Sequence, residues 1–202
     1  MLLTIDQETA RNRANIYKIL SVLYNQPDDE IEQLLAYLQE SLQAYHPQLV
    51  TLVEEMMEEY LAFNGDITPL KVDNAKLFIG PFDVLAPPYG CIYLDGERKL
   101  MGDSTMAAVE LYKEAGLIID EGFKDAPDHI TAELEFIYYL IARYLNADDK
   151  KYIELQHLFI KDHLGRWVEP FTARILERAE TNFYKNLGLI TKKFIDLEFE
   201  SI

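Results

Sequence analysis

The stretch that decides the fold is Gly80-Pro-Phe-Asp-Val-Leu-Ala-Pro-Pro-Tyr-Gly-Cys-Ile-Tyr-Leu-Asp-Gly96. It holds three prolines and three glycines in seventeen residues, so no helix is expected to run through it. Its other side chains are mostly apolar, whereas connecting loops are usually polar and exposed. We therefore expect a stiff loop that packs on the body of the protein or offers a surface to a partner. Within it, Cys91–Leu94 is the only run that favours a β-strand.

On both sides of this stretch, apolar residues recur at the three- and four-residue spacing of buried helix faces. The spacing predicts helices that end before Pro27, follow Asp28 or Asp29, open at Pro47 and run over about Leu70–Ile79. After the stretch it predicts a helix over Thr105–Ala115 with Ser104 as its cap, one from Pro127–Asp128 onward, one from Tyr152 to Gly165, one from Trp167 to Gly188 and a last short one over Ile190–Leu197. This pattern predicts an all-α protein, a single multi-helix bundle over residues 1–202. The long Pro/Gly-rich apolar loop follows the third or fourth helix.

The charge balance narrows the choice of partner. Among 202 residues, 19 are basic and 35 are acidic, which gives a formal net charge of -16. Nucleic acid and anionic membrane surfaces both require a basic face, so neither is expected as a partner. A cationic partner is favoured, since opposite charge speeds encounter. Acidity that serves only solubility is the alternative.

The single cysteine, Cys91, excludes a disulfide within the chain and argues against a cysteine-based zinc site. This usage fits a reducing compartment. The first residues show no basic and apolar signal-peptide pattern, and no apolar run approaches the roughly 20 residues that span a bilayer. A cytoplasmic protein without membrane insertion is expected.

Catalytic signatures are missing from the sequence: it has no nucleophile elbow, P-loop, metalloprotease helix or dinucleotide-binding glycine pattern. The four histidines, His46, His129, His157 and His163, are scattered without metal-ligand spacing. We therefore expect no catalytic residue, no metal and no cofactor, and a protein that binds another protein rather than an enzyme.

Asp128-His129 stands where a long helix is expected to begin. In one interpretation Asp128 is the N-cap of that helix and His129 is a surface residue of its first turn. In the other, both project into a groove, where the imidazole contacts a peptide or titrates near neutral pH.

Four segments, in order, resemble the TorD/DmsD family of molybdoenzyme maturation chaperones, which includes the nitrate reductase chaperones. They are Leu77-Phe78-Ile79-Gly80-Pro81 with Ala86-Pro87-Pro88-Tyr89 and Tyr93; Met101–Thr105; Asp128-His129-Ile130 with Glu133-Leu134; and His163-Leu164 with Trp167, Pro170 and Phe171. Two departures stand out: Asp125-Ala126 replaces the family's Glu-Pro, and Gly90-Cys91-Ile92 replaces Glu-Ser-Val.

The resemblance implies a cytoplasmic chaperone that binds the twin-arginine signal peptide, the core, or both, of a molybdenum-cofactor oxidoreductase precursor, assists cofactor insertion and delays export. It also implies that the loop and the Asp128 helix start lie together as a peptide-binding site. The residues expected there are Phe82, Pro87, Pro88, Tyr89, Tyr93, Asp128, His129 and Glu133. Tyr89 would pack on the apolar part of the peptide, Asp128 would accept from arginine, and His129 would hydrogen-bond.

Several alternatives stay open at this level. A guanine-nucleotide-binding protein or an enzyme on a helical scaffold is the rival function, although the net charge disfavours phosphates. A chaperone of this type can also read its client's mature domain alone. A hinge within residues 80–103 would allow a domain-swapped dimer as well as a monomer.

Overall fold

The structure is a computed structural model that describes residues 6–80, 83–96, 100–118 and 125–201. The elements of this part are α1 Gln7–Leu23, α2 Ile31–Tyr45, α3 Val50–Ala62, α4 Thr68–Asn74, α5 Gly90–Leu94, α6 Asp103–Glu114, α7 Ile130–Ala147, α8 Lys151–Phe159, α9 Gly165–Arg178 and α10 Asn182–Glu200, with a 3-10 turn at Pro47–Leu49 and π-helical turns at Ala75–Ile79 and Ile160–Leu164. Within the described ranges there is no strand, only an isolated bridge between Tyr89 and His129. The predicted all-α class is confirmed.

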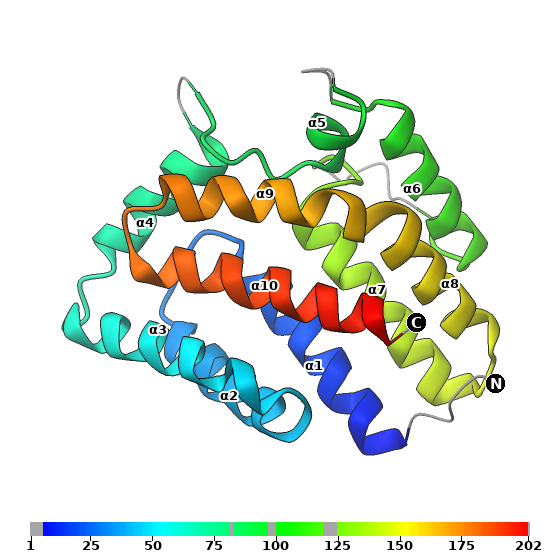
Figure 1. The fold of residues 1–202 in the computed structure, drawn as a ribbon, viewed down its shortest axis with the longest axis horizontal. Coiled ribbons are helices and arrows are strands. Elements are labelled where there is room, and N and C mark those ends of the chain that lie inside the picture. The colour runs from blue at the N-terminus through cyan, green and yellow to red at the C-terminus, as the bar shows by residue number, and fades with distance from the viewer. Residues whose placement is uncertain (1–5, 81–82, 97–99, 119–124, 202) are drawn as a thin grey trace.

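The helices are arranged around α1, α7, α9 and α10 (Figure 1). Helix α1 packs mainly against α7 and α2, and α10 packs mainly against α9 and α3. In Figure 1, α9 and α10 run antiparallel across the front, with α5 and α6 at one corner and α2 and α3 at the opposite corner. From residue 83 on, the chain that leads to α5 passes along the upper edge of Figure 1, above α9.

Aromatic packing fixes the point from which this loop departs. Phe78, in the π-helical turn after α4, has its ring centroid 5.6 Å from Tyr24 of α1 and 5.6 Å from Tyr184 of α10. It also lies 6.2 Å from Phe171 of α9. Burying a large apolar side chain stabilises a fold by about 1.5–3 kcal/mol, so these contacts hold the π-turn firmly. Gly80 follows with φ +61°, a left-handed conformation that turns the chain out of the helix.

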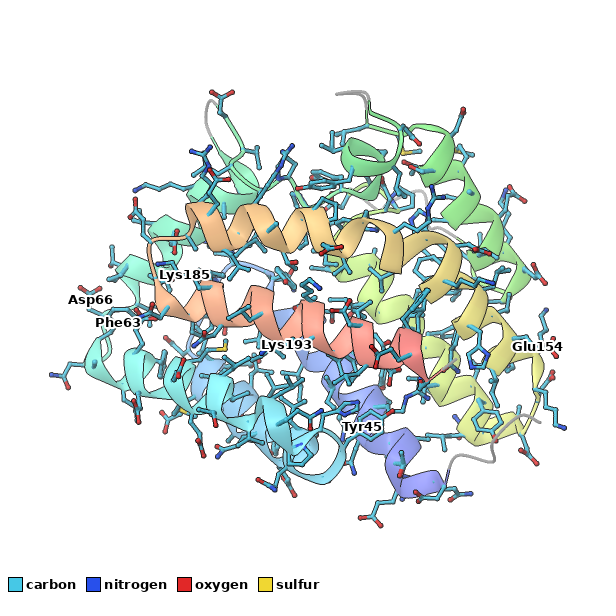
Figure 2. The ribbon with its side chains drawn as sticks, viewed as in Figure 1. Tyr45, Phe63, Asp66, Glu154, Lys185 and Lys193 are labelled. Atoms are coloured by element: carbon cyan, nitrogen blue, oxygen red, sulfur yellow. The ribbon has the colours of Figure 1, made fainter. Side chains whose placement is uncertain are left out.

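A buried polar cluster holds the other end of the bundle together. Glu198 of α10 is fully buried and accepts hydrogen bonds from Arg13 Nε of α1 at 3.0 Å and from Tyr17 at 3.2 Å. Tyr45, at the end of α2 beneath α10 in Figure 2, donates its hydroxyl to the same carboxylate at 2.9 Å. A buried carboxylate needs such partners, and here they tie α1 and α2 to one residue of α10.

The C-terminal helices divide at a different place from the predicted one. A helix over Trp167–Gly188 was expected, but α9 ends at Arg178 and α10 runs through Gly188. The cause is the N-cap Thr181, whose hydroxyl accepts from the Tyr184 amide at 3.4 Å, supported by carboxylates from other segments. Asp73 accepts from the Thr181 amide at 2.8 Å, and Glu59 accepts from the Asn182 amide at 3.1 Å. These carboxylates satisfy the free N–H groups at the start of α10.

Candidate functional site

The apolar loop returns to the bundle at the start of α7. The Gly90 amide donates to the Asp128 carbonyl at 2.9 Å, and the Ile130 amide donates to the Pro88 carbonyl at 2.8 Å. Between these bonds Tyr89 and His129 form an antiparallel bridge, with their rings edge to face at 5.1 Å. The structure therefore brings together the two segments that the sequence placed at one site.

The end of the loop forms a helix where extended structure was expected. Residues Gly90–Leu94 make the short helix α5, so the prediction that Gly80–Asp95 holds no helix is wrong for its last part. All three prolines precede Gly90, so nothing prevents a helical turn beyond it. The turn is started from outside, because the Asp128 carboxylate accepts from the Cys91 amide at 2.7 Å.

Asp128 is therefore not the cap of its own helix, contrary to the first interpretation of the sequence. The N-cap of α7 is His129, whose Nδ1 accepts from the Thr131 amide at 3.2 Å. Asp128 is fully buried and caps α5 instead. Its other oxygen, Oδ1, has no hydrogen-bond partner among the described residues. In this conformation the carboxylate faces the loop rather than solvent.

Glu133, another predicted peptide contact, is also fully buried. It lies 2.6 Å from His163 Nε2 and accepts from Trp167 Nε1 at 3.0 Å. His163 belongs to the π-helical turn Ile160–Leu164, an insertion of the kind that often re-aims a side chain. The cluster joins the third and fourth signature segments inside the protein, so Glu133 acts here as a structural anchor.

The pKa values of this pair are coupled. Burial raises the pKa of the Glu133 carboxyl, against the opposing effect of the nearby imidazole. Burial lowers the pKa of His163, but the charge and the hydrogen bond of Glu133, together with the charge of Asp128, outweigh desolvation, and the net shift is upward. The folded protein therefore holds protons on this pair more tightly than the unfolded chain does.

Tyr93 links the loop to the same cluster. Its ring stacks on Trp167, with centroids 5.7 Å apart and planes 17° from parallel, and its hydroxyl donates to the Pro87 carbonyl at 2.9 Å. The guanidinium of Arg174 lies over the Tyr93 ring, with its central carbon 5.1 Å from the ring centroid. A Cβ at position 90 would come within 3.1 Å of Trp167 Nε1, so glycine there permits the close approach.

The second signature segment is fixed by another remote carboxylate. Ser104 was expected to cap α6, but the N-cap is Gly102, and Asp95 accepts from the Ser104 hydroxyl at 2.9 Å and from its amide at 3.3 Å. A side chain at position 102 would collide with Asp95, its Cβ lying 2.0 Å from Oδ2. Position 102 therefore requires glycine for this contact.

Fewer residues of the candidate site reach the surface than the sequence predicted. Pro87, Tyr89, Tyr93 and His129 are half-buried, whereas Pro88, Asp128 and Glu133 are buried. Phe82 lies outside the described residues. These seven described residues do gather around the loop and the start of α7, but only four of them reach the surface.

Asp125 is a surface residue of this site that was not among the predicted site residues. In the sequence it stands out only as a departure from the family pattern. Its side chain is 46% exposed, and Oδ2 lies 3.8 Å from His129 Nε2. Burial, and then the charge of Asp125, raise the pKa of Tyr89 to about 12. Burial lowers the pKa of His129 despite both neighbouring aspartates, so the ring is neutral near pH 7. The site thus presents an aromatic pair beside a carboxylate.

The part of the chain that the structure describes can also be assessed for metal sites and for membrane-spanning helices. In this part, no group of three or more His, Cys, Asp or Glu side chains is arranged to hold a metal ion. None of the helices described is both long and apolar enough to cross a bilayer.

Comparisons with known proteins agree with this arrangement. The family model of the nitrate reductase delta subunit matches residues 38–173. The chain is 28% identical to chaperone protein TorD of Shewanella loihica, over 98% of this chain and 97% of that protein. It is 25% identical to the perchlorate reductase assembly chaperone protein of Dechloromonas aromatica, over 98% and 92% of the two chains. It is 32% identical to the Tat proofreading chaperone DmsD of Salmonella typhi, over 58% and 54%.

A solved structure also has this fold. The crystal structure described as a redox enzyme maturation protein from Archaeoglobus fulgidus has a TM-score of 0.58, with 97% of this chain and 98% of that chain covered, at 21% identity. The family model and the named relatives place the chain among the helical proteins of redox enzyme assembly. The chain belongs to the nitrate reductase delta subunit family and, within it, to the TorD/DmsD redox enzyme maturation chaperones. The resemblance seen in the four segments is confirmed.

Proposed function

We propose that this protein is a cytoplasmic chaperone, not an enzyme, that binds the twin-arginine signal peptide of a molybdenum-cofactor oxidoreductase precursor. It holds back export while the cofactor is inserted, and it also contacts the client's folded core. The relatives named as chaperones support this function and not the nucleotide-binding alternative.

The observation that carries the proposal is the contact between Tyr89 and His129, beside the exposed carboxylate of Asp125. A signal peptide of this class offers arginines next to an apolar stretch. Its receptor needs a carboxylate for the guanidinium and an aromatic surface for the apolar part. The net charge of -16 adds long-range attraction for such a cationic segment.

Within this proposal the predicted residues have two roles. Tyr89, Pro87, Tyr93 and His129, with Asp125, form the contact surface. Asp128, Glu133 and Pro88 hold that surface in place, which lowers the entropy lost on binding. Asp128 Oδ1 becomes an acceptor for arginine only when the loop shifts, because the residue is buried in this conformation.

Titration calorimetry with a client signal peptide tests the proposal. The peptide is compared with a variant in which both arginines are lysines, on the unmodified protein and on His129→Ala and Asp125→Asn. Arginine forms paired, planar hydrogen bonds with a carboxylate that lysine does not, so the lysine peptide is expected to bind more weakly. Equal binding of both peptides would exclude arginine recognition, and no binding of either would remove the signal peptide as the ligand.

A hinge within residues 80–103 and a swapped dimer remain predictions. Sedimentation of the purified protein over a concentration series distinguishes a monomer from a dimer.

A further inference from the structure

Arg174, an exposed residue of α9, places a positive charge at the edge of the candidate site. Its guanidinium lies over the ring of Tyr93, with the central carbon 5.1 Å from the ring centroid. In this geometry the negative face of the aromatic ring attracts the cation. The chain has a net charge of -16 and a cationic segment is its expected ligand, so a positive group at this place requires an explanation.

Helix α9 supplies Arg174 with no carboxylate partner. Pro170 stands one turn before it and Arg178 one turn after it. Glu177, three residues further on, is paired with Arg178 at 3.3 Å. Among the residues that the structure describes, no carboxylate lies within ion-pair distance of the Arg174 guanidinium. The Tyr93 ring is therefore the electrostatic partner that the structure gives this cation.

The Tyr93 ring is itself fixed in place. It stacks on the fully buried Trp167 with centroids 5.7 Å apart, and it packs edge to face on Phe171 at 6.2 Å. Its hydroxyl is engaged by the Pro87 carbonyl at 2.9 Å. A cation that approaches this ring from outside therefore meets a ring that cannot turn away and that Arg174 already covers.

We propose that Arg174 is an internal competitor for the cationic ligand: it occupies the Tyr93 ring in the free protein, and an arginine of the client's signal peptide displaces it on binding. The proposal rests on the proposed function and concerns the regulation of the same site. Two cations at one ring repel each other, so the ring holds one of them at a time. Displacement returns the Arg174 charge to water, which weakens binding without preventing it and favours later release of the client.

The test compares the removal of one charge at two places on α9. Arg174→Gln removes the guanidinium from the Tyr93 ring, and Arg178→Gln removes the same charge one turn later, where its partner is Glu177. Both side chains are exposed, so both variants are expected to fold, and thermal unfolding verifies this. The three proteins are titrated by calorimetry with a synthetic peptide that carries two consecutive arginines beside an apolar stretch.

The peptide should bind Arg174→Gln about two- to fivefold more tightly than it binds the unmodified protein, the ratio that corresponds to one exposed cation–π contact. Arg178→Gln should bind it as the unmodified protein does. Equal or weaker binding by Arg174→Gln would overturn the competitor role and leave the proposed function standing. An equal gain in both variants would also overturn it, by assigning the effect to net charge. If no variant and no unmodified protein binds the peptide, the proposed function itself fails.

A second measurement follows the displacement directly. In an NMR titration of the unmodified protein with the same peptide, the Arg174 Nε–H signal, assigned by its absence from Arg174→Gln, should move toward the position of a fully hydrated arginine. An Arg174 signal that stays in place while the peptide binds would overturn the proposal, because the guanidinium would then still lie on the ring.

Discussion

The Asp128 carboxylate accepts a hydrogen bond from the Cys91 amide at 2.7 Å, across 37 residues of sequence. Through this bond the residue that begins one signature segment supports the helix that ends another. The Gly90 amide adds a second bond, to the Asp128 carbonyl. The position of the apolar loop, and of Tyr89 within it, therefore depends on this buried side chain together with the backbone bonds at Gly90 and Ile130.

Removing that side chain should loosen the loop. Asp128→Ala leaves the Cys91 amide buried without an acceptor, which costs about 1–3 kcal/mol of unfolding free energy. Amide exchange measured by mass spectrometry should become faster over Gly90–Leu94. Asp128→Asn keeps an oxygen that can accept this hydrogen bond, so it should lose less unfolding free energy than Asp128→Ala. Equal losses for the two variants would show that charge, not the hydrogen bond, holds α5.

The Glu133 cluster should contribute more to the free energy of unfolding than the Asp128 hydrogen bond does. Glu133→Ala leaves the Trp167 indole N–H and the His163 imidazole without their common partner, and losing one member of a buried pair costs about 3–5 kcal/mol. Glu133→Gln retains an acceptor for Trp167 and should cost less. Urea unfolding measures both. A loss below about 1 kcal/mol for the alanine variant would contradict the anchoring role.

The Glu133–His163 pair should make the stability of the fold depend on pH, in a direction that follows from the two pKa shifts. Because the folded-state pKa values of Glu133 and His163 are both raised, their contribution to stability is full below the unfolded values of 4.5 and 6.5 and falls as pH rises past them. The stability advantage of the unmodified protein over Glu133→Gln should therefore shrink as the pH is raised from about 6 to about 9. Urea midpoints at several pH values give the comparison. Parallel curves for the two proteins would refute the coupling.

Position 90 should tolerate only glycine. In Gly90→Ala the new methyl group meets Trp167 Nε1 at 3.1 Å and Glu133 Oε1 at 3.3 Å, both in a buried cluster that cannot retreat easily. Overpacking of this kind costs about 1–3 kcal/mol. Trp167 is the only tryptophan, so its emission spectrum reports directly on the disturbance. An unchanged spectrum and an unchanged melting temperature would mean that the cluster adapts without strain.

Local sequence patterns were sufficient to predict the helices and the family. Apolar spacing located the faces of α2, α3 and α7 because those faces are buried in continuous stripes. The four segments occur in the family's order, and three of them supply contacts to the same buried cluster. Tyr93, Glu133 and Trp167 come from three of those segments and meet directly.

The boundaries of three helices were not predictable in this way. Helices α5 and α6 begin where Asp128 and Asp95 accept from their first amides, and Asp73 holds Thr181, the cap of α10, from another segment. A local pattern contains no record of such a partner. For the same reason Glu133, a carboxylate on a long helix, was assigned to the surface, although His163 and Trp167, 30 and 34 residues later, bury it.

The site was predicted in outline and revised in detail. The pairing of the Tyr89 loop with His129 followed from the family resemblance, and the structure has it. The surface role of Asp125 was visible only as a departure from the family pattern, since exposure depends on how the turn lies.

An amide NMR titration of the protein with a client signal peptide decides whether the Tyr89–His129 surface binds that peptide. If it does, the largest shifts fall on Tyr89, Gly90 and Cys91 and on His129 and Ile130, with little change along α2 and α3. Replacing the two arginines by lysines should reduce these shifts at equal peptide concentration. Shifts confined to helices away from the loop, with Tyr89 and His129 unaffected, would contradict the claim that this surface binds the peptide.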